Sequence, residues 1–322
     1  MPGFAYNIDD LQDITQAEAY GKVLVDLGKE NKNVVALTAD LAKSTKIGIF
    51  FKAYPERSFN FGLAEANMMG AAAGFAISGK IPYVSTFATF ASMRAAEQVR
   101  TDIAYPKLKV RIIATHSGVS FGQAGTTHHC TEDLAIMRSF ANMTVIVPAD
   151  SVETAKVVAA SLDYPGPIYV RIGRGYFEPV AYEDEDYEYK IGQAVTLRDG
   201  KDITVIACGI PVAGAVEAAD ELKEEGINLR VVNMHTIKPI DKEVILTALT
   251  ETSGIITAEE HNIIGGLGGA VAEVIAESQK GTRFRRLGLP DIYSDIGYPE
   301  ELYHRYRLDK EGIIRAVKEM LS

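Results

Sequence analysis

One acidic side chain, Glu65, stands at the start of a segment that is otherwise almost free of charge. The residues that follow it, 66–78, are mostly alanine, glycine and methionine. A helix that is apolar nearly all round is typical of one that other protein surrounds. A carboxylate buried there needs a partner or a shifted pKa, because an unpaired buried charge is costly. Glu65 is therefore a candidate active-site acid, although a lone glutamate in a first turn is more often only a helix-stabilising residue.

Two aromatic residues, Phe87 and Phe90, follow a predicted strand over residues 83–86. Open α/β sheets bind ligands at the carboxyl ends of their strands. Two aromatic rings at that edge would form a wall against which a flat heterocycle can stack. Core packing is the alternative, and from spacing alone it is the favoured one.

A glycine-rich loop, residues 115–130, holds three of the six histidines: His116, His128 and His129. Loops at the carboxyl ends of strands commonly carry chemistry. A metal site formed by His128, His129 and Cys130 is an alternative, but adjacent residues rarely ligate one tetrahedral ion together. A Cys–His nucleophile and a plain surface loop also stay open at this point.

Two further motifs are candidates for binding anions. Arg171 and Arg174 lie at the end of a predicted strand, where they would hold a phosphate through bidentate contacts, unless Arg174 pairs with the acidic residues after it. The glycines of 265–269 precede a predicted helix and resemble an anion-binding turn. Close packing of helix and strand explains these glycines equally well.

Strand and helix patterns alternate along the whole chain, which predicts parallel sheets flanked by helices. Strands are expected at 34–38, 58–61, 83–86, 110–115, 144–147 and 168–172, and helices at 16–29, 66–78, 90–104 and 151–161. Residues 176–190 are acidic and rich in tyrosine, as in a solvated linker or an extended crossing segment. The pattern then restarts, with strands at 203–207, 229–232 and 254–257 and helices at 212–225, 242–249 and 269–277. We therefore expect an α/β protein with a first domain at 1–176, a linker at 177–190 and a second domain at 191–322.

Composition excludes several classes of function. The 322 residues carry a net charge of −10, which argues against nucleic acid or an anionic membrane as partner. The longest apolar stretch is too short to span a bilayer, and the N-terminus lacks the features of a secretory signal. The two cysteines lie in different predicted domains and form no CxxC pair, so we expect a reduced, cytoplasmic setting.

Taken together, these segments resemble the C-terminal half of a transketolase, its pyrimidine-binding domain plus its C-terminal domain. The resemblance runs from about residue 14 to residue 322. Its motifs are Phe-Gly-Leu-Ala-Glu at 61–65, Ser-Thr-Phe at 85–87, Gly-x-x-Gly-x-Thr-His at 122–128 and Glu-Glu-His at 259–261, with Thr-Ala-Asp-Leu at 38–41 in support. Deoxyxylulose-phosphate synthases and the beta subunits of 2-oxo-acid dehydrogenases share the same plan.

The resemblance implies that thiamine diphosphate supplies the chemistry and that the protein tunes it. Glu65 matches the glutamate that hydrogen-bonds a ring nitrogen of the aminopyrimidine and so activates the thiazolium. Phe87 and Phe90 match the aromatic wall on the pyrimidine. His128 matches a histidine that transfers protons on substrate hydroxyls. Asp40 matches an aspartate near the cofactor at the subunit interface.

At the substrate end, His116, Ser44 and Arg171 match residues that hold the phosphate of a sugar phosphate. Two positions depart from the usual pattern. Gln16 stands where most transketolases have an arginine, and Ala124 stands where an aspartate reads an acceptor hydroxyl. Both departures weaken the case for the usual pentose phosphates and favour a shorter, non-phosphorylated or otherwise modified sugar.

The sequence contains no Gly-Asp-Gly, the motif with which thiamine enzymes of this family bind the diphosphate through Mg²⁺. We therefore expect an N-terminal partner subunit to bind diphosphate and Mg²⁺, in a two-plus-two heterotetramer. The expected activity in carbohydrate metabolism is transfer of a two-carbon ketol unit from a ketose or its phosphate to an aldose. The alternatives are a 2-oxo-acid dehydrogenase beta subunit, which would decarboxylate and acylate a lipoyl group, and a non-catalytic interaction subunit that keeps the fold.

Overall fold

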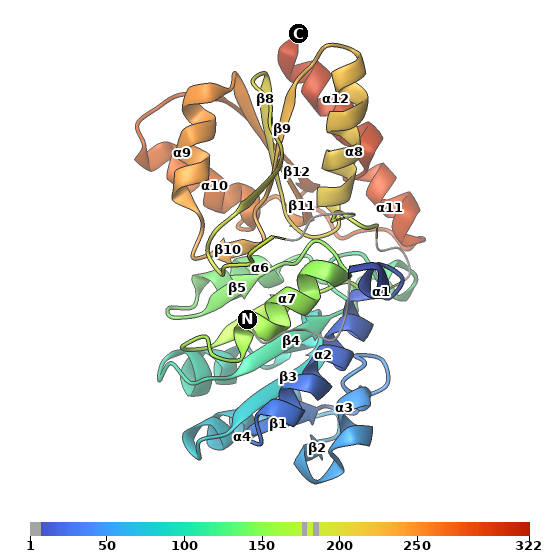
Figure 1. The fold of residues 1–322 in the computed structure, drawn as a ribbon, viewed down its shortest axis with the longest axis vertical. Coiled ribbons are helices and arrows are strands. Elements are labelled where there is room, and N and C mark those ends of the chain that lie inside the picture. Colours follow the sequence, from blue (N-terminus) through green and yellow to red (C-terminus); the bar gives the residue numbers. More distant parts are fainter. Residues whose placement is uncertain (1–7, 176–178, 183–186) are drawn as a thin grey trace.

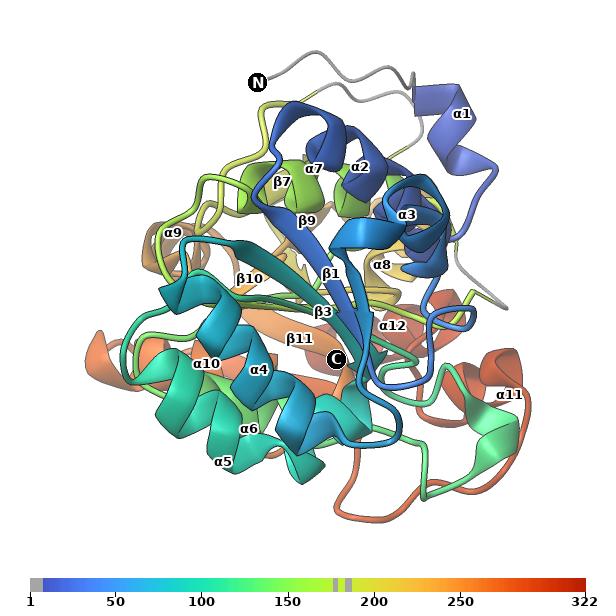
Figure 2. The ribbon, with the colours of Figure 1, turned by 90° about the horizontal axis from the view of Figure 1, so that it is seen from below.

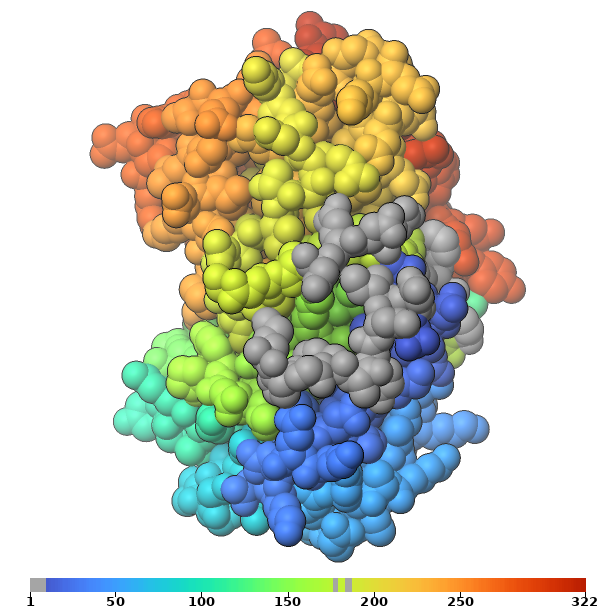
Figure 3. All heavy atoms as spheres, viewed as in Figure 1, coloured from blue at the N-terminus to red at the C-terminus, as the bar shows by residue number. Residues whose placement is uncertain are grey.

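The computed structural model describes residues 8–175, 179–182 and 187–322, which form two domains stacked along the long axis of the molecule (Figure 1). In the space-filling view the blue-to-green first domain and the yellow-to-red second domain lie directly against one another (Figure 3). Both domains are α/β, with mainly parallel sheets flanked by helices, which confirms the predicted fold class.

The first domain is built on a seven-stranded sheet in the order β10-β5-β6-β4-β3-β1-β2. Its strands are β1 (Val34–Thr38), β2 (Ser58–Asn60), β3 (Ile81–Phe87), β4 (Arg111–Thr115), β5 (Thr144–Ile146), β6 (Ile168–Arg171) and β10 (Thr236–Lys238). Strands β1 to β6 run parallel, and β10 is antiparallel to β5. The carboxyl ends of the six parallel strands therefore meet at one edge, where such sheets bind ligands.

Helices cover both faces of this sheet, as seen end-on in Figure 2. On one face lie α2 (Gln16–Glu30) and α7 (Ser151–Ser161), and on the other α4 (Glu65–Ile77) and α5 (Ala96–Gln98). The remaining helical segments are α1 (Ile8–Gln12), α3 (Gly48–Ala53), η1 (Pro55–Arg57), η2 (Phe90–Arg94), η3 (Val99–Ala104), η4 (Gly122–Ala124) and α6 (Asp133–Ser139). Helix α2 begins at a capping box, in which Thr15 and Glu18 satisfy each other's backbone N–H groups.

The second domain has a five-stranded sheet in the order β12-β11-β8-β9-β7. Its strands are β7 (Val195–Arg198), β8 (Ile203–Ala207), β9 (Leu229–Asn233), β11 (Gly254–Asn262) and β12 (Arg283–Leu289), all parallel except β7. Helices α9 (Lys242–Glu251) and α10 (Leu267–Glu277) lie on one side of it in Figure 1, and α8 (Pro211–Glu224) and α12 (Lys310–Leu321) on the other. Helix α11 (Pro299–Arg305) descends toward the first domain.

The structure differs from the predicted elements in two instructive places. The helix expected over 90–104 is interrupted, because π-helical segments η2 and η3 flank the short α5. Strand β10 follows β9 in the second half of the chain but pairs with β5, so the two halves share the first sheet. Lys238 at its end donates to the carbonyl oxygens of Arg138 (2.9 Å) and Phe140 (2.6 Å), which ties it to the end of α6.

Of the two interpretations left open for residues 176–190, the described tyrosines fit an extended crossing segment better than a solvated linker. Tyr182 and Tyr189 are buried, and the rings of Tyr182 and Tyr187 stack at 4.5 Å. The hydroxyl of Tyr187 donates to Glu153 on α7 at 2.9 Å. The tyrosines therefore anchor this crossing segment to the protein, whereas residues 176–178 and 183–186 of the predicted linker lie outside the described residues. Across the described chain, no helix has the length and apolar character needed to cross a membrane.

Candidate active site

Glu65 is the first residue of α4 and is only 4% exposed. Its Oε1 accepts a hydrogen bond from the Arg94 guanidinium at 3.1 Å. The same guanidinium lies over the ring of Phe90, 3.9 Å from its centroid. Phe90 and Arg94 are the first and last residues of the π-helical segment η2, and Arg94 contacts both Phe90 and Glu65. The buried carboxylate thus has a flat, hydrogen-bond-donating partner that is itself stacked on an aromatic ring.

Phe87 and Phe90 leave β3 at the carboxyl edge and form an aromatic cluster with two of the loop histidines. Phe87 stacks on His116 with centroids 3.8 Å apart and lies 5.7 Å from Phe90. His128 meets Phe90 edge-on at 5.5 Å. Phe121, which was not singled out from the sequence, packs edge-on against both histidines at 5.2 and 5.6 Å. The two phenylalanines therefore line a wall of aromatic and imidazole rings, as well as contributing to the core.

His116 is buried at the end of β4, with a left-handed backbone (φ 59°). Its Nδ1 lies 2.8 Å from the Thr115 hydroxyl. Burial, with the positive charge of Arg174 and the neighbouring His128, lowers the pKa of His116 to about 3. At neutral pH this imidazole is therefore an uncharged hydrogen-bonding group, whereas the half-buried His128 lies closer to solvent.

The structure does not bring Arg171 to this cluster. Its side chain is 2% exposed and points into the contact between the domains. Its Nε donates to both Asp133 oxygens (3.1 and 2.9 Å), and an Nη donates to the carbonyl oxygens of Cys130 (3.1 Å) and Glu260 (2.6 Å). A guanidinium buried and engaged in this way is not placed to bind a substrate phosphate at the cluster.

Arg174, three residues further on, is the arginine that lies at the cluster. Its guanidinium carbon is 4.2 Å from the centroid of Phe121. Its charge is also one of the causes that lower the pKa of His116. Arg174 follows the end of β6, whereas Arg171 is still part of that strand. The motif therefore did contain the arginine that lies at the cluster. Which of its two arginines reaches the cluster depends on the residue at which β6 ends.

Asp40 and Ser44 follow β1 at the same edge, and both are exposed. Asp40 has a left-handed backbone (φ 59°) and forms a reciprocal pair with Asn60. The Asp40 N–H donates to Asn60 at 2.9 Å, and the Asn60 amide donates to Asp40 at 3.1 Å. This pair joins the ends of β1 and β2 beside α4. Ser44 makes no hydrogen bond to the cluster among the described residues, so its role at the phosphate end remains a prediction.

Gln16 and Ala124 take up different places around the cluster. Gln16 is 1% exposed and bridges two backbone groups, donating to the Pro148 carbonyl at 3.0 Å and accepting from Gly173 N–H at 2.7 Å. It therefore fixes the turn that precedes Arg174 and adds no charge to it. Ala124 ends η4 within the loop of His128 and is half-buried.

Family models match both domains. The model described as transketolase, pyrimidine binding domain, matches residues 12–178, and the model described as transketolase, C-terminal domain, matches residues 192–313. The chain belongs to the transketolase family. Within that family it corresponds to the C-terminal section, which confirms the resemblance seen in the sequence.

Several relatives of this transketolase-family chain match it over nearly their whole length. A Methanocaldococcus jannaschii protein named as a transketolase C-terminal section is 45% identical, over 95% of this chain and 96% of its own. A subunit of an apulose-4-phosphate transketolase from Phocaeicola vulgatus is 40% identical, over 95% of this chain and 97% of its own. A solved structure described as a split gene transketolase, inactive beta4 tetramer, is 45% identical with a TM-score of 0.85, covering 96% and 98% of the two chains. These relatives do not favour the alternative of a 2-oxo-acid dehydrogenase beta subunit.

The loop histidines of this transketolase-family chain do not form a metal site with Cys130. His129 turns its Nε2 to the Gly122 carbonyl oxygen at 3.1 Å. Cys130 is fully buried, its nearest polar neighbour is the Ser92 hydroxyl at 3.7 Å, and burial raises the pKa of its thiol. A protonated, sealed thiol is a poor nucleophile and a poor ligand.

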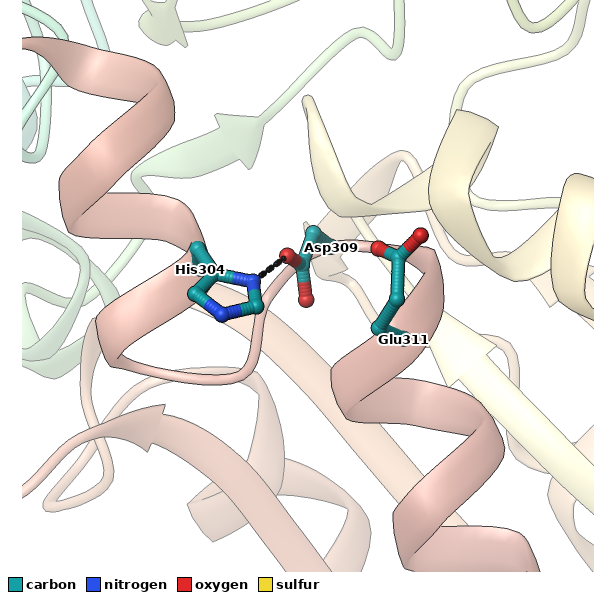
Figure 4. A group of neighbouring side chains, drawn as sticks. All are labelled: His304, Asp309 and Glu311. Carbon is teal, nitrogen blue, oxygen red and sulfur yellow. Dashed lines mark hydrogen bonds and ion pairs between the residues drawn. The ribbon is translucent and has the colours of Figure 1, made fainter.

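Among the described residues, one group could offer three ligand atoms to a metal: His304, Asp309 and Glu311 (Figure 4). Asp309 caps α12 by accepting from the Gly312 N–H at 2.9 Å, and it lies 2.6 Å from Nδ1 of His304. The capping of α12 by Asp309 and the surface pair of Asp309 with His304 explain why these side chains lie together.

The glycine-rich turn before α10 already has an anion of its own. The carboxylate of Glu259 accepts from the Leu267 N–H at 2.6 Å and from the Gly268 N–H at 2.8 Å. A Cβ on Gly266 would collide with that carboxylate. The turn is therefore an internal anion site, in which Glu259 occupies the place that a ligand phosphate would take.

Proposed function

We propose that this chain is the C-terminal subunit of a split, thiamine-diphosphate-dependent transketolase. The enzyme would transfer a two-carbon ketol unit from a ketose or its phosphate to an aldose. The observation that carries the proposal is the buried Glu65 carboxylate beside the ring wall of Phe87, Phe90, His116 and His128. It combines a single buried acid, an aromatic face and imidazoles at the edge where such sheets bind ligands.

The residues present fit an aminopyrimidine. The guanidinium of Arg94 is a flat group that donates to Glu65 and stacks on Phe90 at the same time. An aminopyrimidine has the same two properties, a flat face and a protonated or polarised ring nitrogen. Because the Arg94 side chain is 53% exposed, it is able to move aside into solvent or remain at the rim of the site. The contact between Arg94 and Glu65 thus mimics the hydrogen bond that we assign to the cofactor.

Each side chain of the cluster then has a distinct task. Thiamine diphosphate, when bound, supplies the carbon that takes up the two-carbon unit. Glu65 holds a proton at the ring nitrogen, and burial makes that interaction strong. His128 moves a proton at a substrate hydroxyl, and the neutral His116 orients that substrate. Arg174 binds the anionic end of the sugar in place of Arg171.

We assign the diphosphate and Mg²⁺ to a partner subunit, in a two-plus-two assembly. Support comes from the relatives named as a section or a subunit, which match this chain over 96% and 97% of their own length. The exposed Asp40–Asn60 pair, at the carboxyl edge beside Glu65, is the part of this chain that we expect to face the partner and the cofactor.

The substrate is proposed to be a modified sugar. The relatives named for their substrates act on apulose 4-phosphate and on 6-deoxy-6-sulfo-D-fructose, both of which are unusual sugars. In this chain, Gln16 contributes no charge near the site and Ala124 offers no acceptor to a hydroxyl. Arg174, whose guanidinium lies over Phe121, is then our candidate for binding a phosphate or sulfonate end.

A pull-down of the tagged chain from its native cell extract, followed by titration with thiamine diphosphate and Mg²⁺, tests the proposal. We expect one stoichiometric partner and tight cofactor binding by the complex only. Tight binding by the isolated chain would refute the division of the site between two subunits. A chain that comes down alone and binds nothing would favour a non-catalytic interaction subunit.

A further inference from the structure

The loop that carries His128 has a narrow neck, formed by Gly118 and Cys130. These two residues make a pair of antiparallel backbone hydrogen bonds, with N···O distances of 3.0 and 2.8 Å. Phe121 and His128 lie inside the closed part of the loop, whereas His116 lies just before the neck. The position of the neck therefore sets where the rings of the loop lie relative to Phe87 and Phe90.

Glu260, on β11 of the second domain, holds one side of this neck. Its Oε1 accepts from the Val119 N–H at 2.9 Å and from the Tyr303 hydroxyl at 2.9 Å. The residue is 3% exposed. Gly118 has φ 54°, and any Cβ placed there would collide with the Glu260 carboxylate. The glycine thus lets the loop backbone lie directly on a carboxylate of the other domain.

Arg171 holds the other side of the neck and is tied to the same glutamate. It donates to the carbonyl oxygen of Cys130 at 3.1 Å and to that of Glu260 at 2.6 Å. It also pairs with the Glu260 carboxylate at 3.7 Å and with Asp133 at 2.9 Å. Both strands of the neck are therefore bound to one buried network of charges that spans the two domains.

The tip of the loop rests on the second domain as well. The N–H of Gly297 donates to the Gly122 carbonyl at 3.4 Å, and a Cβ on Gly122 would press on Leu302 of α11. Ile296 packs against Gly125. The loop is thus seated on the second domain from neck to tip, although its functional side chains point to the first domain.

We propose that Glu260 is a positioning residue for the His128 loop, so that the second domain sets the geometry of the active site in the first. The inference rests on the proposed function for its catalytic meaning, but its structural content stands on the contacts alone. It also gives the Glu-Glu-His motif at 259–261 a physical role. Glu259 caps α10, Glu260 holds the loop, and His261 accepts from the Ala135 N–H of α6 at 3.4 Å.

Loop mobility in the full-length free chain tests this inference without any catalysis. The sequence has no tryptophan, so Gln123→Trp on the exposed tip introduces a single reporter. We expect Glu260→Ala to lower the fluorescence anisotropy of that tryptophan clearly. Glu260→Gln keeps an acceptor oxygen for the Val119 N–H and should retain most of the wild-type anisotropy. Tyr303→Phe, which removes only one donor to Glu260, should fall in between.

Glu153→Gln is the matched control. Glu153 is also a buried carboxylate between the domains, accepting from Asn233 at 2.9 and 3.0 Å, but it does not touch the loop. Its variant should lower thermal stability and leave the anisotropy unchanged. An unchanged anisotropy in Glu260→Ala, or an equal loss in Glu153→Gln, would overturn the inference.

Kinetics of the complex reconstituted with its partner extend the test to the active site. We expect Glu260→Ala to lower kcat about tenfold or more, because a loop that is no longer held misplaces His128 relative to the substrate. The cofactor Kd should stay unchanged, and Glu260→Gln should recover most of kcat. If the anisotropy responds as expected while the wild-type complex has no transketolase activity, the proposed function fails and the positioning role stands. If kcat does not follow the anisotropy in an active complex, the positioning role is refuted.

Discussion

Glu65 in the first domain and Glu260 in the second are both buried carboxylates, and they differ in how firmly their partners hold them. Among the residues that the structure describes, Glu65 has one side-chain partner, Arg94, which is 53% exposed. Glu260 is enclosed by a backbone N–H, the Tyr303 hydroxyl and the buried Arg171. A ligand can replace the partner of the first carboxylate without breaking the fold, whereas the partners of the second form the fold itself. Burial alone therefore does not mark a catalytic acid, and the exposed partner is what makes Glu65 the candidate.

The largest effect is expected from Glu65→Gln. A glutamine keeps the shape of the side chain but neither holds nor releases the proton, so turnover should fall by a factor of about 10²–10⁴. Folding and assembly with the partner should be unaffected, because the substitution removes a buried charge without adding bulk. Steady-state kinetics of the reconstituted complex measures this loss. Glu97→Gln, on an exposed position of the neighbouring α5, is the control and should retain full activity. Normal turnover in Glu65→Gln would remove Glu65 from the catalytic cluster.

The two arginines of the 171–174 motif extend this comparison. Arg171 is buried beside Glu260, whereas Arg174 is half-buried at the aromatic cluster. Arg171→Met leaves Asp133 and Glu260 buried beside an uncharged side chain, which should cost about 3–5 kcal/mol of folding free energy. Arg174→Met removes a half-buried cation over Phe121 and should leave stability nearly unchanged. Chemical denaturation of the two variants in parallel measures the difference.

Arg174→Met should instead raise KM for a substrate with an anionic end by about tenfold or more, since a charge-assisted contact contributes roughly 1.5–3 kcal/mol. Arg174→Lys should recover part of this effect, because a lysine keeps the charge but not the planar pair of donors. Equal KM values for phosphorylated and non-phosphorylated sugars in the wild type would contradict the assignment of Arg174 to that end.

The sequence predicted which residues lie at the carboxyl edge of the first sheet. It did not predict the buried charge network that Arg171 forms with Asp133 and Glu260. Glu65, Phe87, Phe90, His116 and His128 each follow a strand end or begin a helix at that edge, and the structure brings them together there. Local pattern suffices for their positions, because parallel strands carry their carboxyl ends to one side, whereas the roles expected of them came from the resemblance to transketolase.

Arg171 is a residue whose partners could not be predicted from local sequence patterns. Its partners Asp133 and Glu260 lie 38 and 89 residues away in sequence, and no local pattern announces such pairs. Strand β10 and the π-helical segments η2 and η3 were also not predicted. Strand β10 forms because it pairs with β5 in the folded protein. The segments η2 and η3 are irregular helical turns, which the periodicity of the sequence does not reveal.

The firmly held carboxylate, Glu260, should also make stability depend on pH. Burial raises the pKa of Glu260 from 4.5 to about 7, so the folded chain holds this proton more tightly than the unfolded chain does. Its stabilising contribution is therefore complete below about pH 4.5 and is lost as pH rises through about 7. Glu260→Gln does not titrate and escapes this loss, which amounts to about 2–4 kcal/mol for a shift of this size. The Tm of the variant relative to the wild type should thus improve between pH 5 and pH 8, as read by thermal unfolding at constant ionic strength.

A Tm difference for Glu260→Gln that stays flat with pH would mean that Arg171 keeps Glu260 ionised throughout.

The smallest effect is expected from Ala124→Asp, on the substrate side of the site. Ala124 lies in η4, within the loop that the second domain supports. An aspartate there would restore the acceptor that reads a sugar hydroxyl, so turnover with ordinary pentose phosphates should rise several-fold. Ala124→Leu, which adds similar bulk without an acceptor oxygen, separates the acceptor from the volume. No gain with any pentose phosphate would mean that this turn does not contact the acceptor sugar.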